Sequence, residues 1–122
     1  MTSFAVPEWS ADKVKRRIVI EILEDGVIKN ELDLSTKATL SIGRNKDFCD
    51  FAIEEPLMSR KHAIFQHRDD GCVFIFDLGS THGTYLNKRR IPSGEFVELK
   101  DGDFLRFGPQ ESKFYIVKFE AE

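Results

Sequence analysis

The sequence predicts an all-β sandwich, the fold class in which two antiparallel sheets pack face to face. About eleven short runs rich in β-branched and aromatic residues follow one another, and turn signals separate them at regular spacing. No run shows the 3.6-residue period of an amphipathic helix. The chain also contains eleven phenylalanines, which suit a sandwich interior because aromatic side chains bury large areas on pleated sheets. Many of them are expected in the core, among them Phe65, Phe74, Phe76, Phe104 and Phe107.

The first two strands form an expected hairpin. Isoleucine occupies every second position from the start of 18–23, which is the two-residue period of a half-buried strand. Asp25-Gly26 is a hairpin turn, since aspartate and glycine accommodate positive φ there. The run 27–34 then returns as the second strand.

Loops and two more Asp-Gly turns, Asp70-Gly71 and Asp101-Gly102, separate the later strands. The first of these turns joins two apolar runs that we expect to pair as neighbours. In chain order, the expected later strands span residues 39–44, 51–53, 62–67, 73–77, 84–86, 89–91, 96–99, 104–107 and 114–119.

At 122 residues the chain predicts one domain whose core is stable without a metal or a disulfide. We expect an N-terminal extension at 1–16, with Trp9 packed back onto the body, and the domain at 17–120. No apolar run approaches the roughly 18 residues of a membrane helix, and the N-terminus lacks signal-peptide features. We therefore interpret Cys49 and Cys72 as free thiols of a reducing intracellular compartment, with a disulfide as the less favoured alternative.

The charge of the chain bears on its partners. The formal net charge is −3 at pH 7, whereas proteins whose main partner is DNA or RNA are usually basic. The basic residues in or beside two polar loops are Arg44, Lys46, Arg60, Lys61, Lys88, Arg89 and Arg90. This distribution predicts a local cationic patch on an acidic body, suited to a small anion or a phosphorylated segment.

Two polar clusters flank the strands expected at 62–67 and 73–77. The first contains Gly43, Arg44, Ser59, Arg60 and His62, and the second contains Ser80, Thr81, His82, Gly83, Thr84 and Asn87. Strands of that length carry distant loops to one end of a sheet, so we expect both clusters to surround one small cavity. Its side chains suit a phosphate ester on a peptide better than they suit bond-breaking chemistry.

The first cluster offers donors for a phosphate. A phosphate ester carries about −1.5 to −2 charges near pH 7, and a guanidinium donates two parallel hydrogen bonds to it. Arg44 is the candidate for this contact, and Gly43 lets neighbouring backbone approach closely. Ser59 would add a hydroxyl donor and Arg60 a backbone N–H. We expect His62 to be structural, holding the Ser59 loop through a ring nitrogen.

The second cluster is expected to hold the peptide. Thr81 and His82 lie at a turn that Gly83 permits, where side chains can hydrogen-bond the main chain of a bound peptide without reading its sequence. The plainer alternative is an ordinary β-turn whose serine and threonine side chains cap their own backbone.

Catalysis and cofactors are not indicated. Asp77, Ser80 and His82 could be arranged as a catalytic triad, but the sequence shows neither an oxyanion-hole signal nor a strained nucleophile turn. The histidines and cysteines match no standard spacing of metal ligands. We therefore expect no enzyme, no metal and no cofactor.

Three motifs resemble, in order and spacing, the signature of the forkhead-associated (FHA) domain. They are Gly43-Arg44, Ser59-Arg60-x-His62, and Ser80-Thr81-x-Gly83-Thr84 followed by Asn87. The resemblance covers residues 17–119. It implies an FHA-type β-sandwich of eleven strands that binds phosphothreonine in other proteins through loops at one end.

The resemblance also implies residue roles. Arg44 and Ser59 would bind the phosphate, and Arg60 would add a contact. Thr81 would help to hold the phosphothreonine and its flanking backbone. The residues implied to support the site are Gly43, His62, Gly83 and Asn87. Position 82 is a departure, because the family usually has an asparagine there and His82 can replace only one of its two hydrogen bonds to the peptide backbone.

Four further segments, 6–10, 49–51, 76–84 and 106–108, resemble one group within this family. A histidine at the position of His82 is usual in this group, and the resemblance implies that this chain is one module of a larger eukaryotic protein. The resemblance implies a nuclear location, with the cytoplasm as a second one, and a phosphothreonine-containing protein or peptide as the partner. We expect a monomer that binds no membrane.

Two alternatives stay open. The first is an FHA-fold scaffold that binds its partner through a sheet face without phosphate. The second is a nucleic-acid binder that uses Arg60-Lys61 and the basic run 88–90, against which the acidic net charge argues.

Overall fold

The structure, a computed structural model, describes residues 4–109 and 111–120, and its regular elements are all β-strands. The strands are β1 (Ile18–Glu24), β2 (Val27–Asp33), β3 (Thr39–Gly43), β4 (Phe51–Ala52), β5 (Ala63–His67), β6 (Val73–Asp77), β7 (Thr84–Leu86), β8 (Arg89–Arg90), β9 (Phe96–Leu99), β10 (Phe104–Phe107) and β11 (Lys113–Phe119). Each expected strand is present, with its ends within one residue of the prediction.

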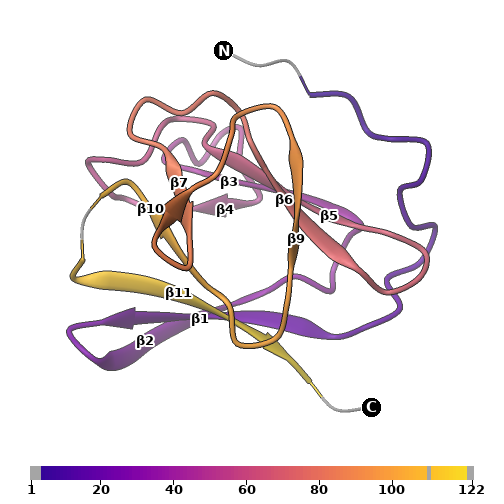
Figure 1. Cartoon of the computed structure of the whole chain (residues 1–122), viewed down its shortest axis with the longest axis horizontal. Helices are drawn as coiled ribbons and strands as arrows, with labels where there is room; N and C mark the ends of the chain where they lie inside the picture. Colours follow the sequence, from indigo (N-terminus) through magenta and orange to yellow (C-terminus); the bar gives the residue numbers. More distant parts are fainter. Residues whose placement is uncertain (1–3, 110, 121–122) are drawn as a thin grey trace.

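The strands form two sheets that face each other (Figure 1). The six-stranded sheet has the order β2-β1-β11-β10-β7-β8, and the five-stranded sheet has the order β4-β3-β5-β6-β9. Only the short pair β3 and β4 is parallel among the described pairs. The predicted all-β sandwich is confirmed.

The interior between the sheets is apolar because inward and outward residues alternate along the strands. The largest fully buried side chains are Tyr115, Phe65, Phe107, Ile18, Ile20, Leu34, Leu40, Ile42, Met58, Ile75, Leu99 and Leu105. Burying each such side chain stabilises the fold by about 1.5–3 kcal/mol. The sandwich therefore has a continuous core that can anchor its end loops.

One phenylalanine expected in the core lies elsewhere. Phe65, Phe74, Phe76 and Phe107 are buried, but Phe104 is only half-buried. Its register in β10 turns it to the outer face of the six-stranded sheet, where its ring packs edge-on against Phe114 at a centroid distance of 5.6 Å. The core prediction is therefore wrong for this residue.

Strands β5 and β6 are buried at every position, although they belong to a two-layer sandwich. The N-terminal segment covers their outer face and explains this burial. Trp9 packs edge-on against Phe74 and Phe96, with ring centroids 5.2 and 4.7 Å apart, and Phe4 lies 5.1 Å from Phe76. The expectation that Trp9 packs back onto the body is confirmed.

Two further sequence expectations concern cysteines and membranes. Cys49 and Cys72 are both free, as predicted. Within the described residues, no helix has the length and apolar character that crossing a membrane would require.

Candidate functional site

Three loops meet where β3 ends, β5 begins and β6 ends. The Arg44 N–H donates to the Ser59 carbonyl at 2.9 Å, and the Asn45 N–H donates to the Arg60 carbonyl at 3.2 Å. A Cβ at Gly43 would fall 2.2 Å from the Arg60 carbonyl oxygen, so this close approach requires glycine. These contacts place the Arg44 and Ser59 side chains beside each other.

His62 connects the Ser59 turn to the loop after β6. The Ser59 N–H donates to Nδ1 of His62 at 3.0 Å, the hydrogen bond that the sequence predicted, and Nε2 lies 3.1 Å from the Gly83 carbonyl oxygen. Since Nδ1 accepts, the hydrogen bonds assign the proton to Nε2 and make the ring neutral. Burial lowers the pKa of His62 and outweighs the Asp77 carboxylate and the Gly83 carbonyl, which raise it.

Asp77 holds the loop after β6, a role that the sequence analysis missed. Its carboxylate accepts hydrogen bonds at 2.6 Å from the hydroxyls of Ser80, Thr84 and Ser93, and at 2.9 and 3.0 Å from the N–H groups of Gly79 and Ser80. Burial alone would raise the pKa of Asp77, but these hydrogen bonds outweigh it and lower the pKa to about 2. An aspartate at a strand end before Gly-Ser is typical of a turn in which the carboxylate caps the backbone, so a local signal existed.

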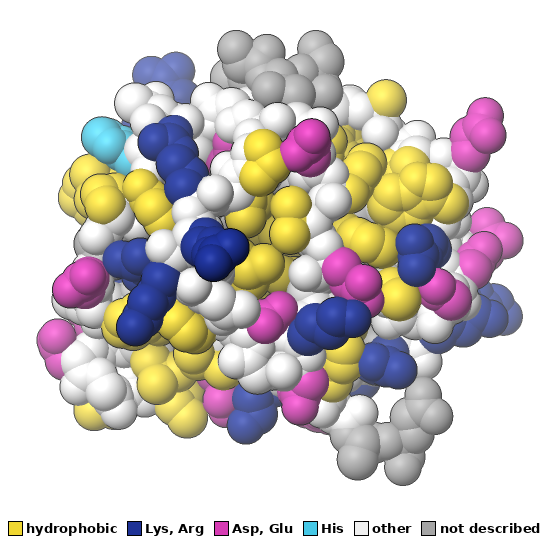
Figure 2. Space-filling model, viewed as in Figure 1, with side chains coloured by type: hydrophobic (Ala, Val, Ile, Leu, Met, Phe, Trp, Pro, Cys, Tyr) yellow, Lys and Arg dark blue, Asp and Glu magenta, His cyan; other side chains and the backbone are white. Residues whose placement is uncertain are grey.

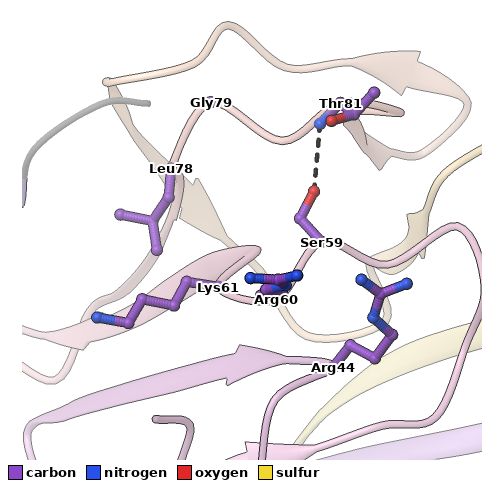
Figure 3. Close-up of a pocket in the computed structure, with 7 residues that line it drawn as sticks. All are labelled: Arg44, Ser59, Arg60, Lys61, Leu78, Gly79 and Thr81. Carbon is purple, nitrogen blue, oxygen red and sulfur yellow. Dashed lines mark hydrogen bonds between the residues drawn. The ribbon is translucent and has the colours of Figure 1, made fainter.

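An open hollow of about 380 Å³ lies between the three loops. It is lined by Arg44, Ser59, Arg60, Lys61, Leu78, Gly79 and Thr81. Figure 3 shows the guanidinium groups of Arg44 and Arg60 below the Ser59 hydroxyl. The Thr81 N–H donates to Ser59 Oγ at 3.2 Å. Because this oxygen already accepts, its own proton remains available to a ligand.

The hollow is cationic. Among the described residues, Arg44, Arg60 and Lys61 form no ion pair with an acidic side chain, and no carboxylate lines the hollow. Figure 2 shows that lysine and arginine side chains are interspersed with acidic ones over the rest of one face, so the lack of an acidic side chain is particular to the hollow. Uncompensated positive charge in a concave site attracts anions.

The lining contains four of the five residues predicted to bind the peptide, all but His82, and none of the four predicted supporting residues. His82 is exposed at the loop tip beside Gly108, where an added Cβ would be 3.6 Å from the His82 Cβ. Asn87 forms the β7–β8 turn with φ +50°, and its side-chain carbonyl accepts the Phe104 N–H at 3.0 Å. Gly83 is buried at φ +85° and bonds His62, so it lies directly behind the hollow.

The basic residues that the sequence grouped together are divided in space. Lys88 lines a separate depression with Arg106, Glu111 and Phe114. Arg90 approaches the site from behind, because its Nε lies 2.5 Å from the position of a Cβ on Gly83.

The serine that the sequence offered for a catalytic triad makes a structural contact instead. Ser80 Oγ donates to Asp77, so this serine is a structural donor and is not aligned with a histidine base. No cluster of histidine, cysteine, aspartate and glutamate that could hold a metal occurs among the described residues. The hollow offers guanidinium, ammonium, hydroxyl and N–H donors, which together recognise an anion.

Fold and lining together define a β-sandwich module with a cationic hollow between loops at one end. The sequence matches the FHA domain family over residues 40–108, more than half of the chain and a span that contains all three motifs. The chain therefore belongs to the FHA domain family, as its motifs indicated. FHA domains are phosphopeptide-binding modules, and the regulatory and interaction proteins among the relatives of this chain indicate a non-catalytic module.

Curated relatives carry a similar domain within longer chains. A protein phosphatase 1 regulatory inhibitor subunit PPP1R8 homolog from Arabidopsis thaliana is 30% identical over 116 residues, covering 95% of this chain and 31% of that protein. Human kanadaptin is 36% identical over 107 residues, covering 80% and 14%. Mouse Smad nuclear-interacting protein 1 is 38% identical over 92 residues, covering 66% and 24%. The chain spans less than a third of each of these relatives. Kanadaptin is the protein whose FHA domain the four further segments resemble, and the homology is confirmed.

Solved structures agree with the fold. The yeast Pml1 splicing factor superposes with a TM-score of 0.86 at 20% identity, covering all of both chains, which shows the fold alone. An FHA domain solved in a study of phosphothreonine-dependent FHA domain interactions has a TM-score of 0.70 at 25% identity, covering 87% of this chain and 99% of that one.

Proposed function

We propose that this chain is a non-catalytic reader of phosphothreonine in partner proteins. Family membership supplies the general activity, which is phosphopeptide binding. The observation that carries the proposal is the meeting of Arg44, Ser59, Arg60 and Thr81 around one hollow that no acidic side chain lines among the described residues. A doubly charged phosphate ester fits such a site better than a neutral peptide does.

Each residue has a distinct role in this proposal. The Arg44 guanidinium donates two hydrogen bonds to phosphate oxygens, and the Ser59 hydroxyl donates one. Arg60 adds a further contact. Thr81 holds the phosphothreonine and its flanking backbone, and the exposed imidazole of His82 bonds the peptide main chain. Preference for threonine over serine comes from an apolar contact with the γ-methyl group, worth roughly 0.8 kcal/mol.

The proposal extends to organisation and location. We assign the FHA domain to 17–120 and an N-terminal extension to 1–16, whose Trp9 reinforces the five-stranded sheet. The relative named Smad nuclear-interacting protein 1 supports a nuclear location. The partner is a phosphothreonine-containing protein that meets a monomer of this chain, and the net charge of −3 argues against nucleic acid.

The test is a binding titration with phosphothreonine, phosphoserine and unmodified threonine peptides from a degenerate library. Arg44→Ala should weaken phosphothreonine binding on the order of 100-fold, because two charge-assisted hydrogen bonds of about 1.5 kcal/mol or more each are lost. Lys29→Ala is the matched control, since it removes one exposed positive charge from β2. The affinity of this variant for the phosphothreonine peptide should stay within about twofold of that of the parent chain.

Phosphothreonine-only binding that depends on Arg44 supports the reader function. If the affinity is the same for phosphorylated and unmodified peptides and is unchanged in Arg44→Ala, the chain is instead an FHA-fold scaffold that binds through a sheet face. Binding to RNA with a steep salt dependence would point to the nucleic-acid alternative.

A further inference from the structure

The hollow contains more positive charge than one phosphate needs. Arg44, Arg60 and Lys61 line it, and none has an acidic ion-pair partner among the described residues. A phosphothreonine brings about −1.5 to −2 charges at pH 7. About one positive charge therefore stays uncompensated when a singly phosphorylated peptide with neutral flanks is bound.

The surplus charge lies on one side of the hollow. In Figure 3, Lys61 extends away from the guanidinium groups of Arg44 and Arg60 and passes below Leu78. Arg44 and Ser59 lie together on the other side. The Lys61 side chain and the candidate phosphate donors Arg44 and Ser59 thus lie on different sides of the lining.

Lys61 is positioned by an aromatic ring. Its Nζ lies 5.1 Å from the ring centroid of Phe48, within the range of a cation–π contact. Phe48 is 62% exposed, which is unusual for a side chain of its size. A cation–π contact of this kind restrains a flexible lysine near one position.

Leu78, another residue that lines the hollow, is firmly held. Leu78 is 6% exposed and packs with Ile64 and Phe76 in a small core cluster, against which Phe4 and Phe96 also pack. Leu78 thus rests on the same aromatic layer that the N-terminal segment covers. The hollow therefore combines a lysine that an aromatic ring restrains with a firmly held apolar side chain.

We propose that Lys61, Phe48 and Leu78 form a second anion subsite, which takes a carboxylate or a second phosphate carried by the same peptide as the phosphothreonine. This inference rests on the proposed function and refines it. The partner is then an acidic or doubly phosphorylated segment. Exposed ion pairs contribute little individually, so the subsite selects among phosphothreonine peptides and does not replace the first phosphate.

The experiment uses the whole chain and three sets of peptides with one phosphothreonine each. The first set has neutral flanks, the second carries one glutamate at each flanking position in turn, and the third carries a phosphoserine in the same positions. At the best position we expect glutamate to strengthen binding about threefold and phosphoserine about tenfold. The two acidic sets separate a carboxylate ligand from a phosphate ligand.

Three variants locate the effect. Lys61→Gln should remove the gain from the second anion and should weaken binding of the neutral-flank peptide less than about threefold. Phe48→Leu keeps every charge and should remove part of the gain, because Lys61 loses its restraint. Lys46→Gln is the matched control, since it removes an exposed charge that does not line the hollow, and it should retain the whole gain.

The possible results separate this inference from the proposed function. A gain that requires Lys61 and is reduced in Phe48→Leu supports the second subsite. If the neutral phosphothreonine peptide binds through Arg44 but no acidic position adds affinity through Lys61, the subsite is refuted and the reader function stands. If no peptide shows dependence on phosphorylation, both proposals fail together.

Discussion

Two neighbouring groups of polar side chains, one around Asp77 and one lining the hollow, are built in opposite ways. Around Asp77, five hydrogen bonds from four residues converge on one carboxylate that is 1% exposed. In the hollow beside it, Arg44, Arg60 and Lys61 are exposed and have no acidic partner among the described residues. One cluster satisfies its polar groups internally, and the other leaves its donors for a ligand.

The residues around Asp77 therefore support the loops, whereas the side chains in the hollow are left to recognise a ligand. Buried polar groups are costly unless they are paired, so the Asp77 cluster is stable only in one arrangement and fixes the loop that carries Thr81. His62 extends this frame by bonding both Ser59 and Gly83. A ligand then meets side chains whose backbone is already ordered, which lowers the entropy cost of binding.

The largest expected effect is a loss of stability when the buried Asp77 carboxylate is removed. Asp77→Ala leaves three hydroxyls and two N–H groups without their acceptor, and it should lower the free energy of unfolding by about 4 kcal/mol. Urea denaturation followed by intrinsic fluorescence measures this loss. Ser93→Ala is the matched control, because it removes one of the five hydrogen bonds and should cost about 1 kcal/mol. An Asp77 variant no less stable than the Ser93 variant would contradict the assigned role of Asp77.

The next effect is on the pH dependence of stability. Burial is the main factor that lowers the folded-state pKa of His62 and of His67, so the unfolded chain takes up protons first as the pH falls below about 6.5. Stability should therefore decrease below pH 6.5, by at most about 1.4 kcal/mol per pH unit for each histidine, until the folded-state pKa is reached. Asp77 contributes separately, because its stabilisation is complete above about pH 4 and is lost towards its folded pKa of about 2.

Urea titrations between pH 7.5 and 5 measure the loss of stability that the histidines cause. Proton NMR of the imidazole signals shows which histidine takes up a proton at each pH. The His62 signal should remain that of a neutral ring below pH 6.5. A His62 that titrates at 6.5 or above would show that burial does not lower its pKa.

Local patterns predict most of the fold, because strand identity depends on neighbouring residues. Alternation in 18–23 and the Asp-Gly turns give the strands and their ends within one residue. The position of Phe104 was not predictable from apolar character, since only the register of β10 decides which face it occupies. The double burial of β5 and β6 depends on Phe4 and Trp9, which reach that face from far away in the sequence.

In the candidate site, too, local motifs predict some features, and packing between distant segments decides the others. The motifs place Arg44, Ser59 and Thr81 at one end of the sheet, and the structure gathers them around one hollow. The bond from Ser93 to Asp77 joins residues sixteen positions apart and crosses two strands, so no local spacing indicates it. The contact between Lys61 and Phe48 likewise depends on how two loops pack.

The smallest expected effect is on the stability of the fold when a side chain that lines the hollow is removed. Arg44→Ala removes an exposed guanidinium without an acidic partner among the described residues, so the free energy of unfolding should change by no more than about 0.5 kcal/mol. A slight gain is expected, because Arg60 and Lys61 then repel fewer like charges nearby. The same urea titration measures it, with Lys29→Ala as the control for loss of a surface charge. A cost above about 1.5 kcal/mol would assign Arg44 to the supporting frame, whereas near-neutral stability with lost phosphopeptide binding would separate recognition from support at a single residue.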